Sequence, residues 1–225
     1  MQVLTKCGIK LNTDKFPDRK IKYYDYSASY IISQVEQSLK NLQTDYIDVL
    51  LLHRPSPFFN PEEVAMAFEQ LRSSGKVNHF GVSNFLPLQL ESLQAYVEEP
   101  LVTNQIEISP YSLEHFENQN LDYLIGKKIK PIAWSPLAGG ELLHPQTDKG
   151  NRVLQAVKKV AQEIDETQLD KVIYQWLLMH PSGIIPVLGT GKIERIKTAV
   201  DSFHIKMTLE QWFQIYAASL GKDLP

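Results

Sequence analysis

Short runs of apolar residues alternate along the chain with segments whose apolar residues recur at helical spacing. The run Val49–Leu52 is the sharpest case, because four successive apolar side chains cannot alternate between a core and solvent. A strand that is buried on both faces is typical of a parallel sheet covered by helices, and such sheets are built from successive βα units. This alternation constrains the chain to the α/β fold class.

The same pattern predicts six strands, and helices between them. No linker or low-complexity segment interrupts the pattern, so one domain over residues 1–225 is expected. A closed parallel barrel has eight strands, whereas six would leave two unpaired edges. Either two strands are missing, or the sheet is open, or another chain completes it. The expected strands are 2–6, 47–52, 78–83, 101–107, 131–135 and 184–188, and the expected helices are 29–42, 86–96, 121–127, 152–164, 168–179, 193–202 and 209–220.

One further helix is predicted from its terminal residues. Asn60 is expected to cap it, Pro61 suits its first turn, and Glu63 is expected to reach back to the backbone of the cap residue. Gly75 is expected just beyond its carboxyl end. Residues 11–28 and 137–150 are expected to be polar loops.

Composition excludes several classes of protein. Of the 225 residues, 43% are apolar and 22% charged, and the net charge is −3, so the chain has the balance of a soluble globule rather than a nucleic-acid or membrane-surface binder. Its one cysteine, Cys7, rules out an internal disulfide and is expected to be a packed thiol. No secretory signal and no apolar run of about 18 residues is present, so a cytoplasmic protein is expected.

Polar residues lie at the end of five predicted strands or just beyond it, and the fourth strand, 101–107, carries them within it. The carboxyl ends of barrel strands carry the chemistry in this class of fold, so we expect these residues to share one rim. Each of them alone is more often structural, and only the whole set favours a site. The set comprises Lys6, His53, Ser83 with Asn84, Gln105, Trp134 with Ser135, and the segment Gly189–Lys192.

The chemistry of this set is coherent. A lysine and a histidine near a carbonyl group can polarise it and tune a proton donor. Hydroxyl and amide side chains can hold a carboxamide, and an exposed indole ring can stack on a flat ring. The Gly189–Lys192 turn opens a helix, and its backbone N–H groups, with Lys192 and Arg195, suit a phosphate. A carboxamide, a flat ring and phosphates together describe a nicotinamide dinucleotide.

Other binding motifs are excluded. The turn lacks the spacing of a Walker A loop, and no G-x-G-x-x-G motif occurs. The remaining histidines show no metal-ligand spacing, so no metal site is expected and we expect them at the surface or in caps. They are His79, His115, His144, His180 and His204.

Six stretches carry a family resemblance: LTKCG, TDYIDVLLLHRP, GKVNHFGVSNF, TNQIEISPY, AWSPLAGG and IIPVLGTGKIERIKTAV. On these motifs and their order, the chain resembles an aldo-keto reductase. The resemblance implies a (β/α)₈ barrel of the TIM type that binds NADPH extended across the strand ends. It also implies hydride transfer to a small carbonyl substrate, an aldehyde or a ketone.

The resemblance also assigns roles to individual residues. It implies that Lys6 and His53 are catalytic. It implies that the cofactor is held at its carboxamide by Ser83, Asn84 and Gln105, at its ring by Trp134 in place of the usual tyrosine, at its pyrophosphate by Ser135 and Leu137, and at its adenosine phosphate by Gly189, Thr190, Gly191, Lys192 and Arg195.

The chain departs from the family pattern at its start. Members of the family have two further strands before the lysine strand, with an Asp and the Tyr that donates the proton, whereas here the lysine is residue 6. Tyr23, Tyr24 and Tyr26 come after that strand, in the wrong place for the donor. We therefore expect six of the eight βα units in this chain. We also expect that the 225-residue chain reduces carbonyl compounds very slowly or not at all. The alternatives are a truncated reductase, an NADPH-binding or regulatory protein without turnover, and a chain that needs a complementing N-terminal segment or an oligomer.

Overall fold

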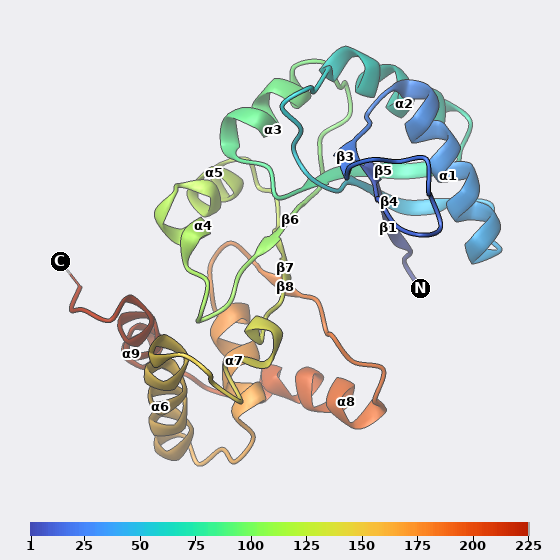
Figure 1. Cartoon of the computed structure of the whole chain (residues 1–225). Helices are drawn as coiled ribbons and strands as arrows, with labels where there is room; N and C mark the ends of the chain where they lie inside the picture. Colours follow the sequence, from blue (N-terminus) through green and yellow to red (C-terminus); the bar gives the residue numbers. More distant parts are fainter. Residues whose placement is uncertain (225) are drawn as a thin grey trace. The chain divides into compact units, whose positions relative to one another are not determined.

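The computed structural model describes residues 1–224, and Pro225 lies outside the described residues. The chain divides into two compact units, Met1–Asn104 and a second unit that begins at Gln105. Strands and helices alternate in both, which confirms the α/β fold (Figure 1). The single domain over residues 1–225 stays a prediction.

The first unit is built on three parallel strands. They are β1 (Leu4–Cys7), β4 (Ile47–Leu52) and β5 (Val77–Ser83), in that order in the sheet. The register places Cys7 beside Leu52 and Leu52 beside Val82. All three carboxyl ends therefore lie at the same edge. The helices of this unit are α1 (Ala28–Leu42), α2 (Pro61–Ser73) and α3 (Pro87–Gln94), and α1 and α2 lie side by side (Figure 1).

The core of the first unit confirms the prediction of a strand buried on both faces. Leu50, Leu51 and Leu52 are at most 1% exposed. Phe68 of α2 stacks on Phe80 of β5 with ring centroids 3.9 Å apart. The apolar side chains of β4 thus meet protein on both sides, as a central parallel strand requires.

The start of α2 confirms one part of the predicted cap and contradicts another. The Asn60 side chain accepts a hydrogen bond from Glu62 N, and Pro61 is the first helical residue. Glu63 does not reach back to the cap residue: its Oε2 accepts from Ala28 N at 3.0 Å. The reason is that the first turn of α1 presents a backbone donor to Glu63, and α1 and α2 are neighbours. Gly75, at φ 71°, follows the helix end as predicted.

Part of the polar loop expected at 11–28 is ordered as a short hairpin. The strands β2 (Ile9–Lys10) and β3 (Tyr23–Tyr24) pair antiparallel, with Ile9 beside Tyr24. Two-residue strands carry no periodicity that a sequence pattern could reveal. The hairpin joins the two ends of the loop formed by residues 11–22, which we call the excursion.

The second unit continues the parallel arrangement. Its strands are β6 (Asn104–Glu107), which begins at the last residue of the first unit, β7 (Ile132–Trp134) and β8 (Ile185–Pro186), with β7 in the middle. The described residues thus contain six parallel strands, as predicted. The helices are α4 (Glu114–Glu117), α5 (Asn120–Gly126), α6 (Asp148–Glu163), α7 (Leu169–Leu178), α8 (Ile193–Asp201) and α9 (Leu209–Leu220), with 3₁₀ turns η1 (Ala138–Gly140) and η2 (Ser202–His204).

Helices α6 and α9 lie side by side in the second unit (Figure 1). Trp176 of α7 and Trp212 of α9 stack with centroids 4.7 Å apart, and each indole N–H donates to the other's backbone carbonyl, at 3.0 and 2.9 Å. Both indoles therefore bury their rings without losing a hydrogen-bond partner. This pair anchors α9 to α7.

Two sequence expectations for the second unit were wrong, and one short helix was not predicted. The loop expected at 137–150 contains the start of α6, because the Thr147 side chain accepts from Gly150 N and so caps a helix that begins at Asp148. The short helix α4 had no counterpart in the prediction. His115, expected at the surface or in a cap, is 7% exposed and bonds Asn120 Nδ2 through its Nδ1.

Among residues 1–224, no helix combines the length and the apolar character that crossing a membrane requires.

Candidate active site

The first unit brings four of the predicted site residues to one edge of its sheet. Lys6 is the third residue of β1, His53 directly follows β4, and Ser83 ends β5 with Asn84 next in the chain. The three strands are parallel neighbours, so their ends meet.

His53 extends the pairing of β4 by one residue. Its backbone N–H donates to Cys7 O at 3.0 Å, and Pro55 follows two residues later, which cannot donate to a ladder. The imidazole is half-buried. Burial lowers its pKa, and the positive charges of Lys6, Arg54 and Lys22 lower it further. His53 is therefore held neutral over a wider pH range than a solvated histidine.

Lys6 is half-buried, and burial lowers the pKa of its amine. Its charge is the strongest of the three that act on His53. The two side chains therefore share one electrostatic site. A lysine cation and a neutral imidazole are groups that can supply a positive charge and a hydrogen bond to a carbonyl oxygen.

Asn84 connects the ends of β4 and β5. Its Nδ2 donates to Ser83 Oγ at 2.9 Å and to His53 O at 3.3 Å. The residue adopts a left-handed backbone conformation, φ 63°, which asparagine tolerates better than most residues. Ser83 is buried at 2% exposure. A hydroxyl and an amide therefore lie together beside the histidine backbone.

Asn104 supports this arrangement and was not identified from the sequence. It is fully buried, donates to Phe85 O at 2.7 Å and accepts from Phe85 N at 3.4 Å. It thus fixes the backbone that immediately follows Asn84. The signal that could have found it is a second amide beside Gln105 in an otherwise apolar strand.

Tyr26 was also missed. It is 6% exposed, and its hydroxyl donates to Arg54 O at 2.5 Å and accepts from Arg54 N at 3.1 Å. Burial raises the pKa of its phenol. The sequence offered only its place in a tyrosine-rich loop, which does not predict a backbone partner 28 residues away.

In the second unit, four predicted site residues lie in β6 and β7 or directly after β7. Gln105 is buried in β6, and Trp134 ends β7 with its ring partly exposed. Ser135 follows in a left-handed conformation, φ 50°, and its carbonyl accepts from Ala138 N at 2.8 Å. This turn places Leu137, which is half-buried, immediately before η1.

The segment after β8 forms an exposed helix start. Thr190 Oγ1 accepts from Lys192 N at 3.1 Å, and α8 begins at the next residue. The backbone of Gly189 and Gly191 is exposed and has open space beside both glycines. Lys192 and Arg195 are exposed at the first turn. A helix amino terminus with two cations suits an anion.

Each unit by itself offers groups of the kind that a nicotinamide dinucleotide needs. A carboxamide needs both donors and acceptors, and the hydroxyl of Ser83 and the amide of Asn84 lie together in the first unit. In the second unit, β6 carries the amide of Gln105. The half-exposed indole of Trp134 offers a flat face, and the start of α8 offers backbone N–H groups to phosphate. Within residues 1–224 no three His, Cys, Asp or Glu side chains gather as metal ligands would.

Comparison with known proteins identifies the family. The sequence model described as "Aldo/keto reductase family" matches residues 1–219. An uncharacterized oxidoreductase of Bacillus subtilis, YcsN, is 48% identical over the whole chain, which covers 75% of that protein. The oxidoreductase YdhF of Escherichia coli is 44% identical, and the 6-dehydroglucose reductase of Agrobacterium fabrum is 41% identical. The chain covers 74% of each, so it spans about three quarters of these relatives' length.

Solved structures share the fold. The glycerol dehydrogenase of Gluconobacter oxydans superposes with a TM-score of 0.83 at 22% identity, over 100% of this chain and 74% of that one. A thermostable aldo-keto reductase in complex with the inhibitor epalrestat superposes at 0.78 and 23% identity, over 86% and 67% of the two chains. The family match over residues 1–219 and the relative that is 48% identical over the whole chain establish that the chain belongs to the aldo/keto reductase family.

Proposed function

We propose that this protein reduces aldehydes or ketones to alcohols with NADPH as the hydride donor. Family membership supports carbonyl reduction in general. The observation that carries the proposal is the pair of Lys6 and His53, which belong to two adjacent parallel strands and in which the Lys6 charge lowers the pKa of His53. The pair provides what a carbonyl oxygen needs as negative charge develops on it.

The bound cofactor would supply the hydride. His53, held neutral by burial and by Lys6, would orient the carbonyl oxygen through a hydrogen bond. The Lys6 amine would stabilise negative charge on that oxygen, and a proton taken up from solvent water would complete the alcohol. In the first unit, Ser83 and Asn84 would contact the carboxamide, and in the second unit Gln105 and Trp134 are the proposed cofactor contacts. The exposed cations Lys192 and Arg195 favour NADPH over NADH, because the former carries an additional phosphate.

A second candidate is a protein that binds NADPH without turnover. The Tyr26 hydroxyl donates its proton to Arg54 O and accepts from Arg54 N, so it is engaged by the backbone and does not serve as a proton donor to a substrate. General acid catalysis is typically worth about 10² to 10⁴-fold, so its loss would leave binding without a useful rate. The structure of the cofactor residues is compatible with both candidates.

The names of relatives suggest the carbonyl compounds to test first. Two relatives, 41% and 38% identical, are 6-dehydroglucose reductases, and a third, 31% identical, is a glyoxal reductase of Bacillus subtilis. We propose sugar-derived and dicarbonyl aldehydes as the first substrate classes. Both carry oxygen atoms beside the reacting carbonyl, which polar loops can recognise.

Cofactor titration followed by an activity assay separates the two candidates. NADPH and NADH are titrated into the 225-residue chain while tryptophan fluorescence is recorded, with Trp134→Ala as the control. Trp176 and Trp212 supply the background, since they are buried on each other. We expect saturable quenching by NADPH that Trp134→Ala removes, and weaker binding of NADPH to the Lys192→Gln/Arg195→Gln variant.

Oxidation of NADPH by 6-dehydroglucose, glyoxal and methylglyoxal then measures turnover. A reductase oxidises NADPH, and Lys6→Met lowers kcat by about 10²-fold or more. Quenching without oxidation favours the binding protein. A folded chain that shows neither quenching nor oxidation contradicts both candidates.

A further inference from the structure

The chain leaves β1 at Gly8, makes the excursion 11–22 and returns to the same place. The return is fixed by the β2–β3 pairing and by a hydrogen bond from Asp25 N to Gly8 O at 2.9 Å. Both contacts lie within three residues of the end of β1. Tyr26, which follows Asp25, therefore lies at the end of β1, the strand that carries Lys6.

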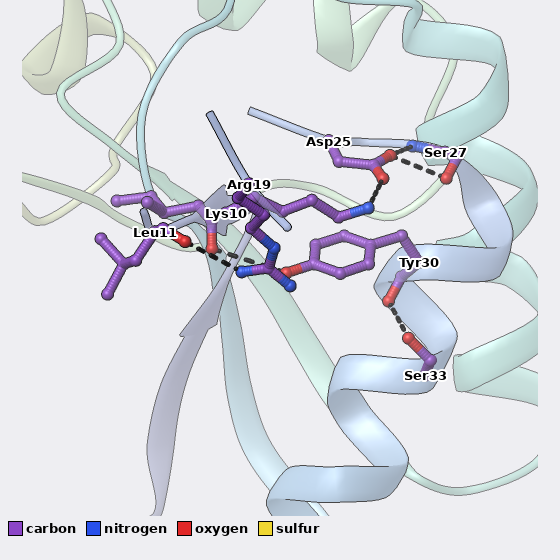
Figure 2. A network of polar contacts seen from close by, with 8 residues as sticks. Lys10, Leu11, Arg19, Asp25, Ser27, Tyr30 and Ser33 are labelled. Carbon is purple, nitrogen blue, oxygen red and sulfur yellow. Dashed lines mark hydrogen bonds and ion pairs between the residues drawn. The ribbon is translucent and has the colours of Figure 1, made fainter. Parts of the chain in front are cut away.

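An ion pair reinforces the base of the excursion. Lys10 Nζ lies 2.6 Å from Asp25 Oδ2 and 4.4 Å from the centre of the Tyr30 ring. The other carboxylate oxygen of Asp25 accepts from Ser27 N and Ser27 Oγ, at 3.1 and 2.8 Å. Figure 2 shows these side chains converging from the two sides of the base of the excursion and from the start of α1. The backbone on both sides of Tyr26 is thus held by polar contacts.

The ring of Tyr26 lies directly on Gly8. A Cβ atom added to Gly8 would lie 2.0 Å from Tyr26 Cε1, and Gly8 has φ +108°. Only glycine permits both this backbone conformation and this approach. The ring therefore packs on the backbone two residues after Lys6.

The hydroxyl of the same side chain holds the end of the neighbouring strand. It donates to Arg54 O at 2.5 Å and accepts from Arg54 N at 3.1 Å. Arg54 directly follows His53, at the point where β4 has ended and Pro55 prevents further pairing. The Tyr26 hydroxyl thus gives the Arg54 backbone, next to His53, the hydrogen bonds that strand pairing no longer supplies.

Aromatic and polar contacts extend this connection. The Tyr26 ring makes an edge contact with Phe59, and Phe59 makes one with Phe85, at centroid distances of 5.7 and 5.8 Å. On the backbone, His53 O accepts from Asn84 Nδ2. A displacement of the His53–Arg54 backbone would therefore move the acceptor that orients Asn84.

We propose that Tyr26 is a positioning residue, whose ring on Gly8 and hydroxyl on the Arg54 backbone hold the ends of β1 and β4 together so that Lys6, His53 and Asn84 keep their relative places. The inference rests on the proposed function, because it treats these three residues as the reaction centre. Tyr26 itself moves no proton in the reaction. Its hydroxyl is engaged on both sides by backbone.

The test compares Tyr26→Phe with Tyr30→Phe in the 225-residue chain. Each substitution removes one hydroxyl and keeps the ring. The Tyr30 hydroxyl lies 3.5 Å from Ile9 O, away from the His53 backbone, so this variant controls for the general loss of a phenol oxygen. Circular dichroism and thermal unfolding first establish that both variants fold.

The first readout does not depend on activity. NMR titration of the histidine ring signals, with His53 assigned through His53→Gln, reports how far the imidazole is shielded from water. We expect the His53 pKa to rise toward the ordinary value near ~6.5 in Tyr26→Phe, since a loosened backbone exposes the ring, and to be unchanged in Tyr30→Phe. An unchanged His53 titration in folded Tyr26→Phe overturns the proposal.

The second readout is turnover with the best aldehyde found. Misplacement by about 1 Å can cost about 10²-fold, so kcat in Tyr26→Phe is expected to fall roughly 10- to 100-fold with a smaller change in KM. Wild-type kcat in Tyr26→Phe also overturns the proposal. If the wild-type chain shows no turnover, the proposed function fails, while the NMR titration still tests the positioning role.

A conservative replacement covers the case in which Tyr26→Phe does not fold. Replacement of Tyr26 by 4-aminophenylalanine keeps the ring and an N–H donor for Arg54 O but weakens the acceptor for Arg54 N. We expect a rise of the His53 pKa that is smaller than the one for Tyr26→Phe, and partial retention of kcat. A histidine titration that matches wild type in this variant contradicts the proposed role.

Discussion

His53 is the residue whose charge state the site controls most directly. Burial is the larger reason for its lowered pKa, and Lys6 is the strongest of the charges that lower it further. Burial and charge can be separated experimentally, because substitution of a charged neighbour leaves the imidazole buried. The pKa of His53 therefore reports on the charges that surround it in the site.

Lys6→Met removes that charge and keeps most of the side-chain volume. We expect the His53 pKa to rise, since protonation of the imidazole no longer meets a neighbouring cation, yet to stay below about 6.5 because burial persists. NMR titration of the histidine signals measures the change. Lys22→Met is the control: Lys22 makes the smallest contribution of the charges that act on His53, so its rise is expected to be smaller. A larger rise in Lys22→Met than in Lys6→Met would contradict this account.

At the residue scale, position along a strand was predictable and side-chain orientation was not. The meeting of Lys6, His53 and Ser83 follows from parallel strands that end at one edge, which the apolar pattern already indicates. The roles of Tyr26 and Asn104 depend on backbone partners at Arg54 and Phe85, which are distant in sequence. No local pattern encodes such partners, so the supporting contacts appear only in three dimensions.

At the scale of elements, α1 and α2 are joined by one hydrogen bond to a charged group. Glu63 Oε2 accepts from Ala28 N, which lies in the first turn of α1, where backbone N–H groups lack helical acceptors. Ser27, the residue at the amino-terminal cap of α1, makes no side-chain cap hydrogen bond. The Glu63 carboxylate of α2 therefore caps the amino terminus of α1.

Glu63→Ala tests this contact, and Glu62→Ala is its matched control. Both glutamates lie in the first turn of α2, so both substitutions remove the same favourable interaction with that helix's amino terminus. Glu62 is exposed, whereas Glu63 is half-buried. A hydrogen bond to a charged group is worth about 1.5–3 kcal/mol, so Glu63→Ala is expected to lower the free energy of unfolding by about 1–2 kcal/mol more than Glu62→Ala in urea. Equal losses would show that the Glu63–Ala28 contact contributes nothing.

The elements that the sequence predicted well are those with a strong hydrophobic pattern, either helical spacing over several turns or a continuous apolar run. Helix α9 has the predicted bounds, 209–220, and β4 has the predicted bounds 47–52. The start of α6 was placed too late, because Gly150 reads as a loop residue while the Thr147 cap decides the boundary. The hairpin strands β2 and β3 are too short for any periodicity. Cap chemistry and short pairings thus limit prediction more than the hydrophobic pattern does.

At the scale of the whole molecule, buried titratable groups set the range of pH in which the chain is stable. His53, His115 and His180 have lowered pKa values, with burial the largest cause for each. An unfolded chain binds protons at these histidines near pH ~6.5, before the folded chain does. Stability is therefore lost as the pH falls from about 6.5 toward the lowered folded values.

The alkaline side has the opposite cause. Burial raises the pKa of the Cys7 thiol from 9.0 to about 12. It also raises the pKa values of the Tyr26 and Tyr174 phenols. Above pH 9 the unfolded thiol loses its proton while the folded thiol keeps it, so the folded state binds more protons and stability falls as the pH rises.

Urea unfolding at pH values of about 5, 8 and 10 is expected to give the highest midpoint at the middle value, because the two groups of residues titrate on opposite sides of it. The two sides can be separated by substitution. His180→Gln is expected to flatten the loss of midpoint on the acid side and leave the alkaline side unchanged, since it removes one of the lowered histidines. Cys7→Ala is expected to flatten the loss of midpoint on the alkaline side and to leave the acid side unchanged. A midpoint that keeps rising up to pH ~10 in the wild-type chain would show that these buried groups do not govern the stability of the fold.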